Sequence, residues 1–144
     1  MRRLSFAIAL LCSMTSASAL EFVSLANNAI VLDANSRLAK PQFILLKGTP
    51  VEQLVVLESW VKLREASGGI GWVERSAISA TRSVIVTAPT ADVRQAATPD
   101  APVVFSVTRD LLLEPVDKPV GPWIKVRHRD GRSGFIEVRA VWGL

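Results

Sequence analysis

Residues Trp123–Val141 read WIKVRHRDGRSGFIEVRAV, and residues Trp60–Ile78, sixty-three positions earlier, read WVKLREASGGIGWVERSAI. Seven of the nineteen positions are identical without a gap, and five more exchange one apolar residue for another. A repeat of about sixty residues is too long for a solenoid unit and has the size of a small domain. The sequence therefore predicts one small domain that occurs twice.

Each copy has the pattern of a β-hairpin. In Trp123–Arg127, branched apolar residues alternate with Trp and basic residues, which is typical of a half-buried strand. Asp130 and Gly131 then form a pair favoured in a type I′ turn, where both central residues have positive φ. The alternation resumes in Gly134–Glu137, and Ser67–Gly69 supplies the same turn freedom in the first copy.

The remaining sequence consists of short apolar runs separated by turns. Residues 29–32, 43–46 and 51–57 are runs of this kind, and no segment shows a sustained helical period. The pattern predicts an all-β protein of two tandem small β-barrels. The predicted division is a first unit at 20–79, a linker at 80–83 and a second unit at 84–144. Because the linker is short and such units bury modest cores, we expect the two units to contact each other.

Residues 1–19 have the features of a secretory signal peptide in the usual order. Two arginines precede an apolar run, and small residues precede Ala19. The apolar run is too short to span a bilayer as a helix. We therefore expect cleavage between Ala19 and Leu20 and release into the periplasm or outside the cell.

The composition of residues 20–144 excludes several classes of protein. This part has no cysteine, so no disulfide can form. It has fifteen lysines and arginines against thirteen acidic residues, a net charge of about +2. Such a mild charge, together with export, argues against nucleic acid as a partner. No second apolar stretch approaches bilayer length, so we expect no membrane span after cleavage.

The supply of reactive residues argues against an enzyme. His128 is the only histidine, so a zinc site of Cys and His is impossible, and a Ser-His-Asp set would have to use this residue. His128 follows Ile124 and Val126 at a spacing of two, which predicts a structural role at the end of the core. Paired carboxylates among the thirteen acids remain possible. We expect neither catalysis nor a cofactor.

The alternation also predicts a candidate binding face. If Val61 and Leu63 point into the core, their neighbours point outward, and the same holds in the second copy. The outward residues are Trp60, Lys62, Arg64, Trp123, Lys125 and Arg127. An aromatic residue followed by two cations can hold a sugar face against the ring and carboxylates against the bases. Alternatively, each Trp packs against neighbouring segments and the bases form a solvated face. Trp142, past the last apolar position, is predicted to fix the C-terminus by packing.

The second copy resembles the bacterial SH3-like domain family. The resemblance rests on Val93-Arg94, Thr98-Pro99, Trp123–Arg127 and Gly134–Ile136, in this order. The family typically shows an Asn-Val-Arg opening, a Gly-Trp-hydrophobic-Lys-Val strand and a Gly-Trp-Val strand after an Asp-Gly turn. Asp92 stands where the family usually has Asn. The first copy resembles the family chiefly at 60–78.

This resemblance implies binding rather than catalysis. Domains of the family commonly accompany cell-wall hydrolases and other envelope proteins, and some bind peptidoglycan. The chain has no tyrosine, and Ala77 and Ala140 stand where related domains carry a ligand tyrosine, so recognition of proline-rich helices is not expected. Two functions remain open. One is an envelope-binding module for peptidoglycan or another anionic component. The other is an adaptor that binds another periplasmic protein.

Overall fold

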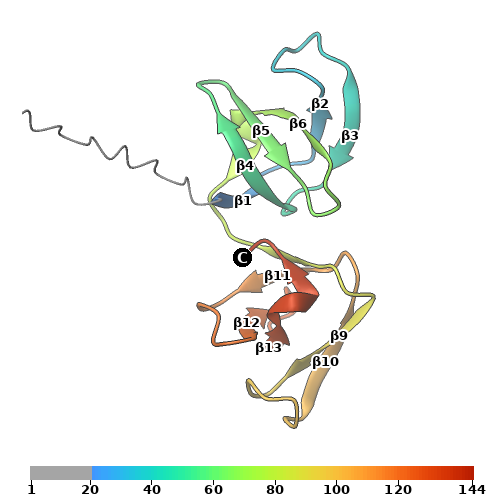
Figure 1. Ribbon diagram of the computed structural model, residues 1–144, viewed down its shortest axis with the longest axis vertical. Helices are drawn as coiled ribbons and strands as arrows, with labels where there is room; N and C mark the ends of the chain where they lie inside the picture. The colour runs from blue at the N-terminus through green and yellow to red at the C-terminus, as the bar shows by residue number, and fades with distance from the viewer. Residues whose placement is uncertain (1–20) are drawn as a thin grey trace, which may run out of the picture.

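The computed structural model describes residues 21–144, which form two β-rich units one above the other (Figure 1). The first unit consists of β1 (Glu21–Leu25), β2 (Ala29–Leu32), β3 (Pro41–Leu45), β4 (Pro50–Val56), β5 (Trp60–Arg64), β6 (Ile70–Glu74), the 3₁₀ turn η1 (Arg75–Ala77) and β7 (Ile78–Ser79). The second consists of β8 (Val84–Val86), β9 (Thr90–Arg94), β10 (Val103–Thr108), β11 (Leu112–Pro115), β12 (Trp123–Arg127), β13 (Ser133–Glu137), η2 (Val138–Ala140) and β14 (Val141–Trp142). The all-β prediction is confirmed. The predicted cleavage site at Ala19 and Leu20 lies outside the described residues.

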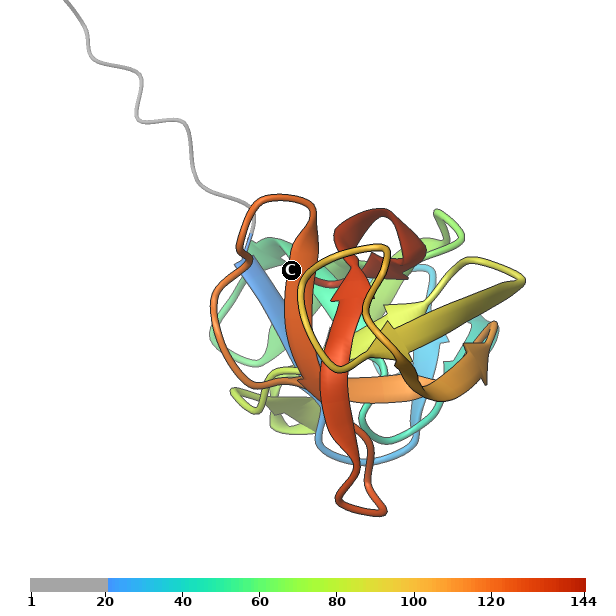
Figure 2. The same ribbon diagram turned by 90° about the horizontal axis from the view of Figure 1, so that it is seen from below.

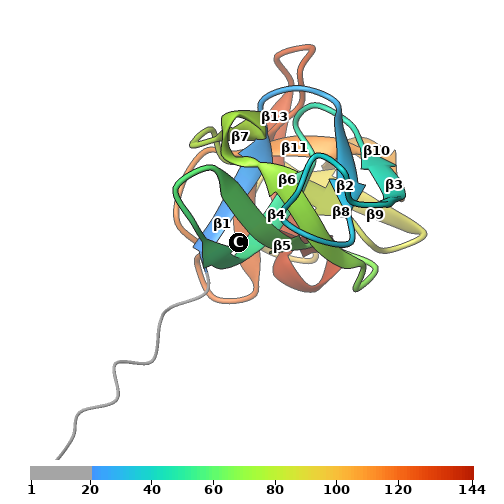
Figure 3. The same ribbon diagram turned by 90° about the horizontal axis from the view of Figure 1, so that it is seen from above.

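The two sheets have the same topology. The strand order is β3-β2-β6-β5-β4-β1-β7 in the first and β10-β9-β13-β12-β11-β8-β14 in the second. Neighbouring strands are antiparallel. Seen along the long axis of the molecule, the two units lie one in front of the other (Figures 2 and 3). The pairings among the described strands leave β3 and β7, or β10 and β14, as the two edges of each sheet. Each sheet is therefore curled without a closed ring of hydrogen bonds.

The period-two pattern decides which residues form the cores. Val61 and Leu63 in β5 are fully buried, as are Ile124 and Val126 in β12, so the predicted inward positions are confirmed. The first core contains Val23, Leu25, Val31, Val51, Val61, Leu63 and Val73. The second contains Val84, Val86, Val93, Phe105, Val107, Leu113, Ile124, Val126, Ile136, Ala140 and Val141. No helix in the described part of the chain is long and apolar enough to cross a membrane.

The hairpin turns differ from the predicted type I′ turn. Gly131 has a φ of 93°, but Asp130 is not in the positive-φ region. The N–H of Gly131 donates to the carbonyl of His128 (2.9 Å), and the N–H of His128 donates to the carbonyl of Arg132 (2.8 Å). Such bonds define a type I turn followed by a left-handed glycine, which needs positive φ at only one residue. The prediction of a hairpin is right, and the predicted turn type is wrong.

Different side chains stabilise the two hairpin turns. In the first unit, the carboxylate of Glu65 accepts hydrogen bonds from the N–H of Ser67 (2.7 Å), the N–H of Gly69 (2.7 Å) and the Ser67 hydroxyl. Burial raises the pKa of Glu65, but these three hydrogen bonds together lower it below its ordinary value. In the second unit, hydrogen bonds from Arg132 hold the pKa of Asp130 well below its ordinary value.

The segment between the two units is fixed to both of them. The hydroxyl of Ser83 donates to the carbonyl of Gly48 in the first unit (2.5 Å). Arg82 donates through Nη2 to the carbonyl of Gly143 at the end of the second (2.8 Å). A Cβ placed on Gly48 would lie 3.2 Å from Cδ1 of Leu112, so the two units also contact each other directly. The expectation that the units touch is confirmed.

Candidate functional site

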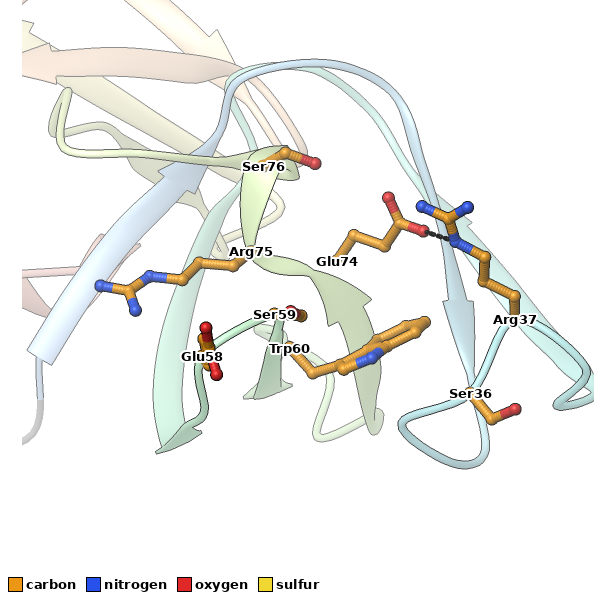
Figure 4. A pocket seen from close by; sticks show the side chains of 8 residues that line it. All are labelled: Ser36, Arg37, Glu58, Ser59, Trp60, Glu74, Arg75 and Ser76. Carbon is orange, nitrogen blue, oxygen red and sulfur yellow. Dashed lines mark hydrogen bonds and ion pairs between the residues drawn. The ribbon is translucent and has the colours of Figure 1, made fainter.

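A hollow of about 700 Å³ surrounds Trp60 in the first unit (Figure 4). Its walls come from the β2–β3 loop, the β4–β5 turn and the end of β6 with η1. The lining residues, which we call the Trp60 pocket, are Ser36, Arg37, Glu58, Ser59, Trp60, Glu74, Arg75 and Ser76. Figure 4 shows the indole of Trp60 reaching across the hollow toward the loop that carries Ser36 and Arg37.

The strand pattern explains why the indole lies in this hollow. Because Val61 is buried in the core, Trp60 must point to the opposite face of β5, where it is partly exposed. The turn before it is closed by the N–H of Leu57, which donates to the carbonyl of Trp60 (2.8 Å). The N–H of Arg75 donates to the carbonyl of Ser59 (2.9 Å) and so brings η1 against this turn.

The charges of the Trp60 pocket are mixed. Nε of Arg37 lies 2.7 Å from Oε1 of Glu74, and the two side chains are 83% and 42% exposed. Arg75 donates through Nη1 to the carbonyl of Leu57 at 3.5 Å, and Glu58 supplies a second carboxylate. The indole reaches toward Arg37 and Glu74, while Arg75 and Glu58 lie on the other side of the hollow (Figure 4). Such a site can contact a ligand that carries both carboxylate and amino groups, with an apolar face against the ring.

An apolar extension adjoins the Trp60 pocket. A second hollow of about 550 Å³ shares Arg37, Trp60 and Glu74 with it and continues over β2 to Ile30 and Pro41. The two hollows together form a groove that begins at charged side chains and ends at apolar ones. An extended ligand would therefore meet two chemically different regions along its length.

The second unit has a smaller and less open counterpart. A hollow of about 340 Å³ is lined by Trp123 and Glu137, at the positions that match Trp60 and Glu74, and by Arg94 and Arg139. Trp123 is only 5% exposed. Arg139 forms an ion pair with Glu137. The repeated Trp is thus partly exposed in one unit and buried in the other, so the two positions are not equivalent as contacts.

The predicted cations of the first unit do not line the Trp60 pocket. Nζ of Lys62 lies 5.9 Å from the ring centroid of Trp72, a cation–π distance. Arg64 donates through Nε to Oε2 of Glu52 at 2.7 Å, and Glu52 is 3% exposed. The positive charge beside Trp60 comes instead from Arg37 and Arg75.

The predicted cations of the second unit are also separated from its Trp. Arg127 forms two hydrogen bonds with Glu114, from Nε at 3.2 Å and from Nη2 at 2.8 Å. Lys125 is partly exposed and lies opposite Phe135 across β12 and β13. Alternation places these residues on the correct face of the strand. It does not show which loop residues complete a hollow.

Four residues of the Trp60 pocket were not predicted from the sequence, namely Arg37, Glu58, Glu74 and Arg75. One signal for Glu74 was available, because it is identical to Glu137 in the repeat and ends the return strand in both copies. The other three lie in turns whose positions depend on tertiary contacts. Between Glu21 and Leu144, no cluster of three or more His, Cys, Asp or Glu residues is placed to hold a metal ion.

The only histidine has a structural environment. The side chain of His128 is 15% exposed, and its Nδ1 lies 3.0 Å from Oδ2 of Asp130 in the hairpin turn. The imidazole also packs against Phe105, with ring centroids 6.0 Å apart. This position at the end of the second core agrees with the predicted structural role.

The curled antiparallel sheet, with a Trp-lined hollow beside a 3₁₀ turn, defines the units as SH3-like β domains. Residues 87–143 match the model of the bacterial SH3 domain, and the second unit is a member of that family. A comparison with the curated proteins gives no match.

Several solved structures are similar to the chain. NlpC1 and NlpC2 from Trichomonas vaginalis share 15% and 13% identity with it over 94% and 86% of this chain, each with a TM-score of 0.39. An NlpC/P60 family protein from Bacillus cereus ATCC 10987 shares 13% identity over 85% of this chain, also with a TM-score of 0.39. The chain spans about half the length of these proteins, namely 50%, 48% and 56%.

Proposed function

We propose that the protein is a non-catalytic binding module of the cell envelope, located in the periplasm or secreted. Its ligand is peptidoglycan or another anionic envelope component, and the Trp60 pocket is the contact site. The observation that carries the proposal is the partly exposed indole of Trp60 between two arginines and two glutamates. Membership of the second unit in the bacterial SH3 family supports it.

The chemistry of the pocket favours peptidoglycan over a purely anionic polymer. Peptidoglycan carries sugar rings, free carboxylates and amino groups within a short distance of one another. Sugar faces pack on indole rings, carboxylates pair with Arg37 and Arg75, and amino groups pair with Glu58 and Glu74. A polymer whose charges all have one sign would be repelled by the pocket side chains of the same sign.

The experiment is co-sedimentation of residues 20–144 with purified sacculi. We expect Trp60→Ala to weaken binding by about ten-fold or more, which corresponds to ~1.4 kcal/mol. Arg37→Ala with Arg75→Ala should also weaken it, and should reduce its sensitivity to salt, because exposed charge contacts are screened. Lys125→Ala with Arg127→Ala is the matched control, since it removes the same charge from the other unit.

Two outcomes would contradict this proposal. One is unchanged binding by the folded Trp60→Ala protein at every salt concentration. The other is a loss of binding in the Lys125 and Arg127 control alone, which would transfer the site to β12. The adaptor alternative is favoured by the apolar edge of the first unit at β3, which adjoins the apolar end of this groove.

A further inference from the structure

The end of strand β3, Phe43-Ile44-Leu45, is apolar on both faces, although the strand lies at the edge of its sheet. It is the first strand in the sheet order and the outermost strand of the first unit in Figure 1. Phe43 and Leu45 pack against the core, while Ile44 points the other way and is 65% exposed. Apolar residues on both faces are typical of strands that are covered on both sides. Exposed apolar edges invite pairing with another chain.

The second unit shows that the fold does not require this composition. Its equivalent strand, β10, begins with two exposed valines, Val103 and Val104, which are 46% and 37% exposed. The rest of β10 alternates, with Phe105 and Val107 buried and Ser106 and Thr108 exposed. Ile30 and Ile44 are direct partners across β2 and β3, and they are 54% and 65% exposed. The same register position in the second unit is occupied by Asp92 and Ser106, and the Ser106 hydroxyl donates to Oδ1 of Asp92 (2.8 Å).

The difference between the units extends beyond one pair. Leu38, Leu46 and Ile70 are 97%, 63% and 47% exposed in the first unit. Their counterparts in the second unit are Asp100, Thr108 and Ser133, all polar. A shallow groove of about 400 Å³ runs along Ile30, Pro41, Gln42, Phe43 and Ile44. One copy of the repeat therefore has exposed apolar residues at five positions that are polar in the other copy, and the fold does not require them.

The charges around this surface indicate its occupant. Lys40 and Lys47 flank β3 and are exposed, and neither has an ion-pair partner among the residues that the structure describes. No acidic residue occurs from Ala34 to Val51. Pairing of β3 with a second copy would bring two lysines of each chain together, and like charges oppose such pairing. A strand with acidic ends would find a complementary charge at both ends of β3.

We propose that the β2–β3 edge of the first unit is a docking surface for an extended segment of another protein, apolar in its middle and acidic at both ends. The segment adds to the sheet beside β3. Its backbone pairs with the free edge, and its side chains cover Phe43 and Leu45 on one face and Ile44 on the other. This surface is separate from the charged half of the Trp60 pocket.

The test uses a labelled peptide of alternating valine and alanine with aspartates at both ends, and a second peptide with lysines in place of the aspartates. We expect the acidic peptide to bind residues 20–144 about ten-fold more tightly than the basic one. Backbone amide shifts should change along Pro41–Leu45. Ile30→Asp with Ile44→Ser should weaken binding by about ten-fold or more, since it introduces the pair that the second unit already accommodates. If that protein does not fold, Ile44→Ser alone gives the same test.

The other outcomes overturn the proposal. Equal binding of both peptides, or no binding of the acidic one, would exclude this occupant. If the unmodified protein is a dimer and Ile30→Asp with Ile44→Ser makes it monomeric, a second copy of the chain covers the surface. If the unmodified protein binds vesicles of anionic lipid and the same variant does not, the surface contacts lipid. Arg37→Ala with Arg75→Ala should leave peptide binding unchanged, so this proposal and the proposed function fail independently.

Discussion

The ring of Phe22 and the indole of Trp142 meet edge to face, with centroids 4.9 Å apart and planes at 84°. Phe22 lies in β1 of the first unit and Trp142 in β14 of the second, so the contact joins the two units. Trp142 does fix the end of the chain, as the sequence analysis predicts, and its partner is a residue 120 positions earlier. Aromatic pairs of this geometry contribute about 0.5–1.5 kcal/mol beyond the area that they bury.

Trp142→Ala should therefore destabilise both units together. We expect a loss of roughly 1–3 kcal/mol in the free energy of unfolding, because a large ring at a contact surface is removed. Urea unfolding, monitored through the amide signals of each unit, measures this loss separately for the two units. Trp142→Phe, which keeps a ring, serves as the control. A loss confined to the second unit would show that the two units do not stabilise each other.

Two glycines of the second hairpin should respond differently to alanine. Gly131 has a φ of 93° and no atom within 4 Å of an added Cβ, so Gly131→Ala should lose about 1 kcal/mol from backbone strain alone. At Gly134, an added Cβ would lie 2.5 Å from the carbonyl oxygen of Arg94. Gly134→Ala should therefore separate β13 from β9 and destabilise the unit more. Thermal unfolding distinguishes the two variants, and equal losses would contradict this explanation.

The two Arg–Glu pairs of the repeat should differ in strength. Glu52 is buried and its Oε1 has no hydrogen-bond partner among residues 21–144, so Arg64→Ala should leave a buried unpaired carboxylate and lose about 2–4 kcal/mol. The equivalent pair of Glu114 and Arg127 has side chains 53% and 46% exposed. Arg127→Ala should lose about 0–1 kcal/mol, because exposed ion pairs contribute little. Chemical denaturation of both variants checks the contrast, and a larger loss in Arg127→Ala would reverse it.

Glu65 should make the first hairpin sensitive to acid. Its pKa is lower in the folded protein than the ordinary value of about 4.3 in an unfolded chain. The stability that it contributes is therefore complete above pH ~4.3 and is lost as the pH falls through the lower folded pKa. Amide exchange of Ser67 and Gly69, measured between neutral pH and about pH 3, reports the loss. Glu65→Gln should show a smaller pH dependence at these amides, and an unchanged profile would rule out this carboxylate as the cause.

The parts of the fold that depend on alternation could be predicted from the sequence. Val61, Leu63, Ile124 and Val126 are buried because residues at a spacing of two share one face of a strand. The same rule places Trp60 and Trp123 on the outer face but does not state how far each is covered. That coverage depends on loops, which differ between the two copies.

The loops also explain what the sequence did not reveal about the site. Arg37 reaches Glu74 from 37 positions away, and Arg75 lies beside Trp60 only because η1 folds against the β4–β5 turn. Neither spacing follows from local periodicity. The turn at Asp130 and Gly131 was misjudged for a related reason, since the residue pair is compatible with more than one turn type.

The fixed linker also has a consequence for a polymeric ligand. Because Ser83 and Arg82 bind both units, the hollows at Trp60 and Trp123 keep one separation. A polymer with one group that fits the hollow at Trp60 and, at the matching interval, a smaller group that fits the hollow at Trp123 would occupy both, and the second contact would form at high effective concentration. A polymer with any other interval would gain no avidity at all. The fixed spacing between the units would then select ligands by their repeat length.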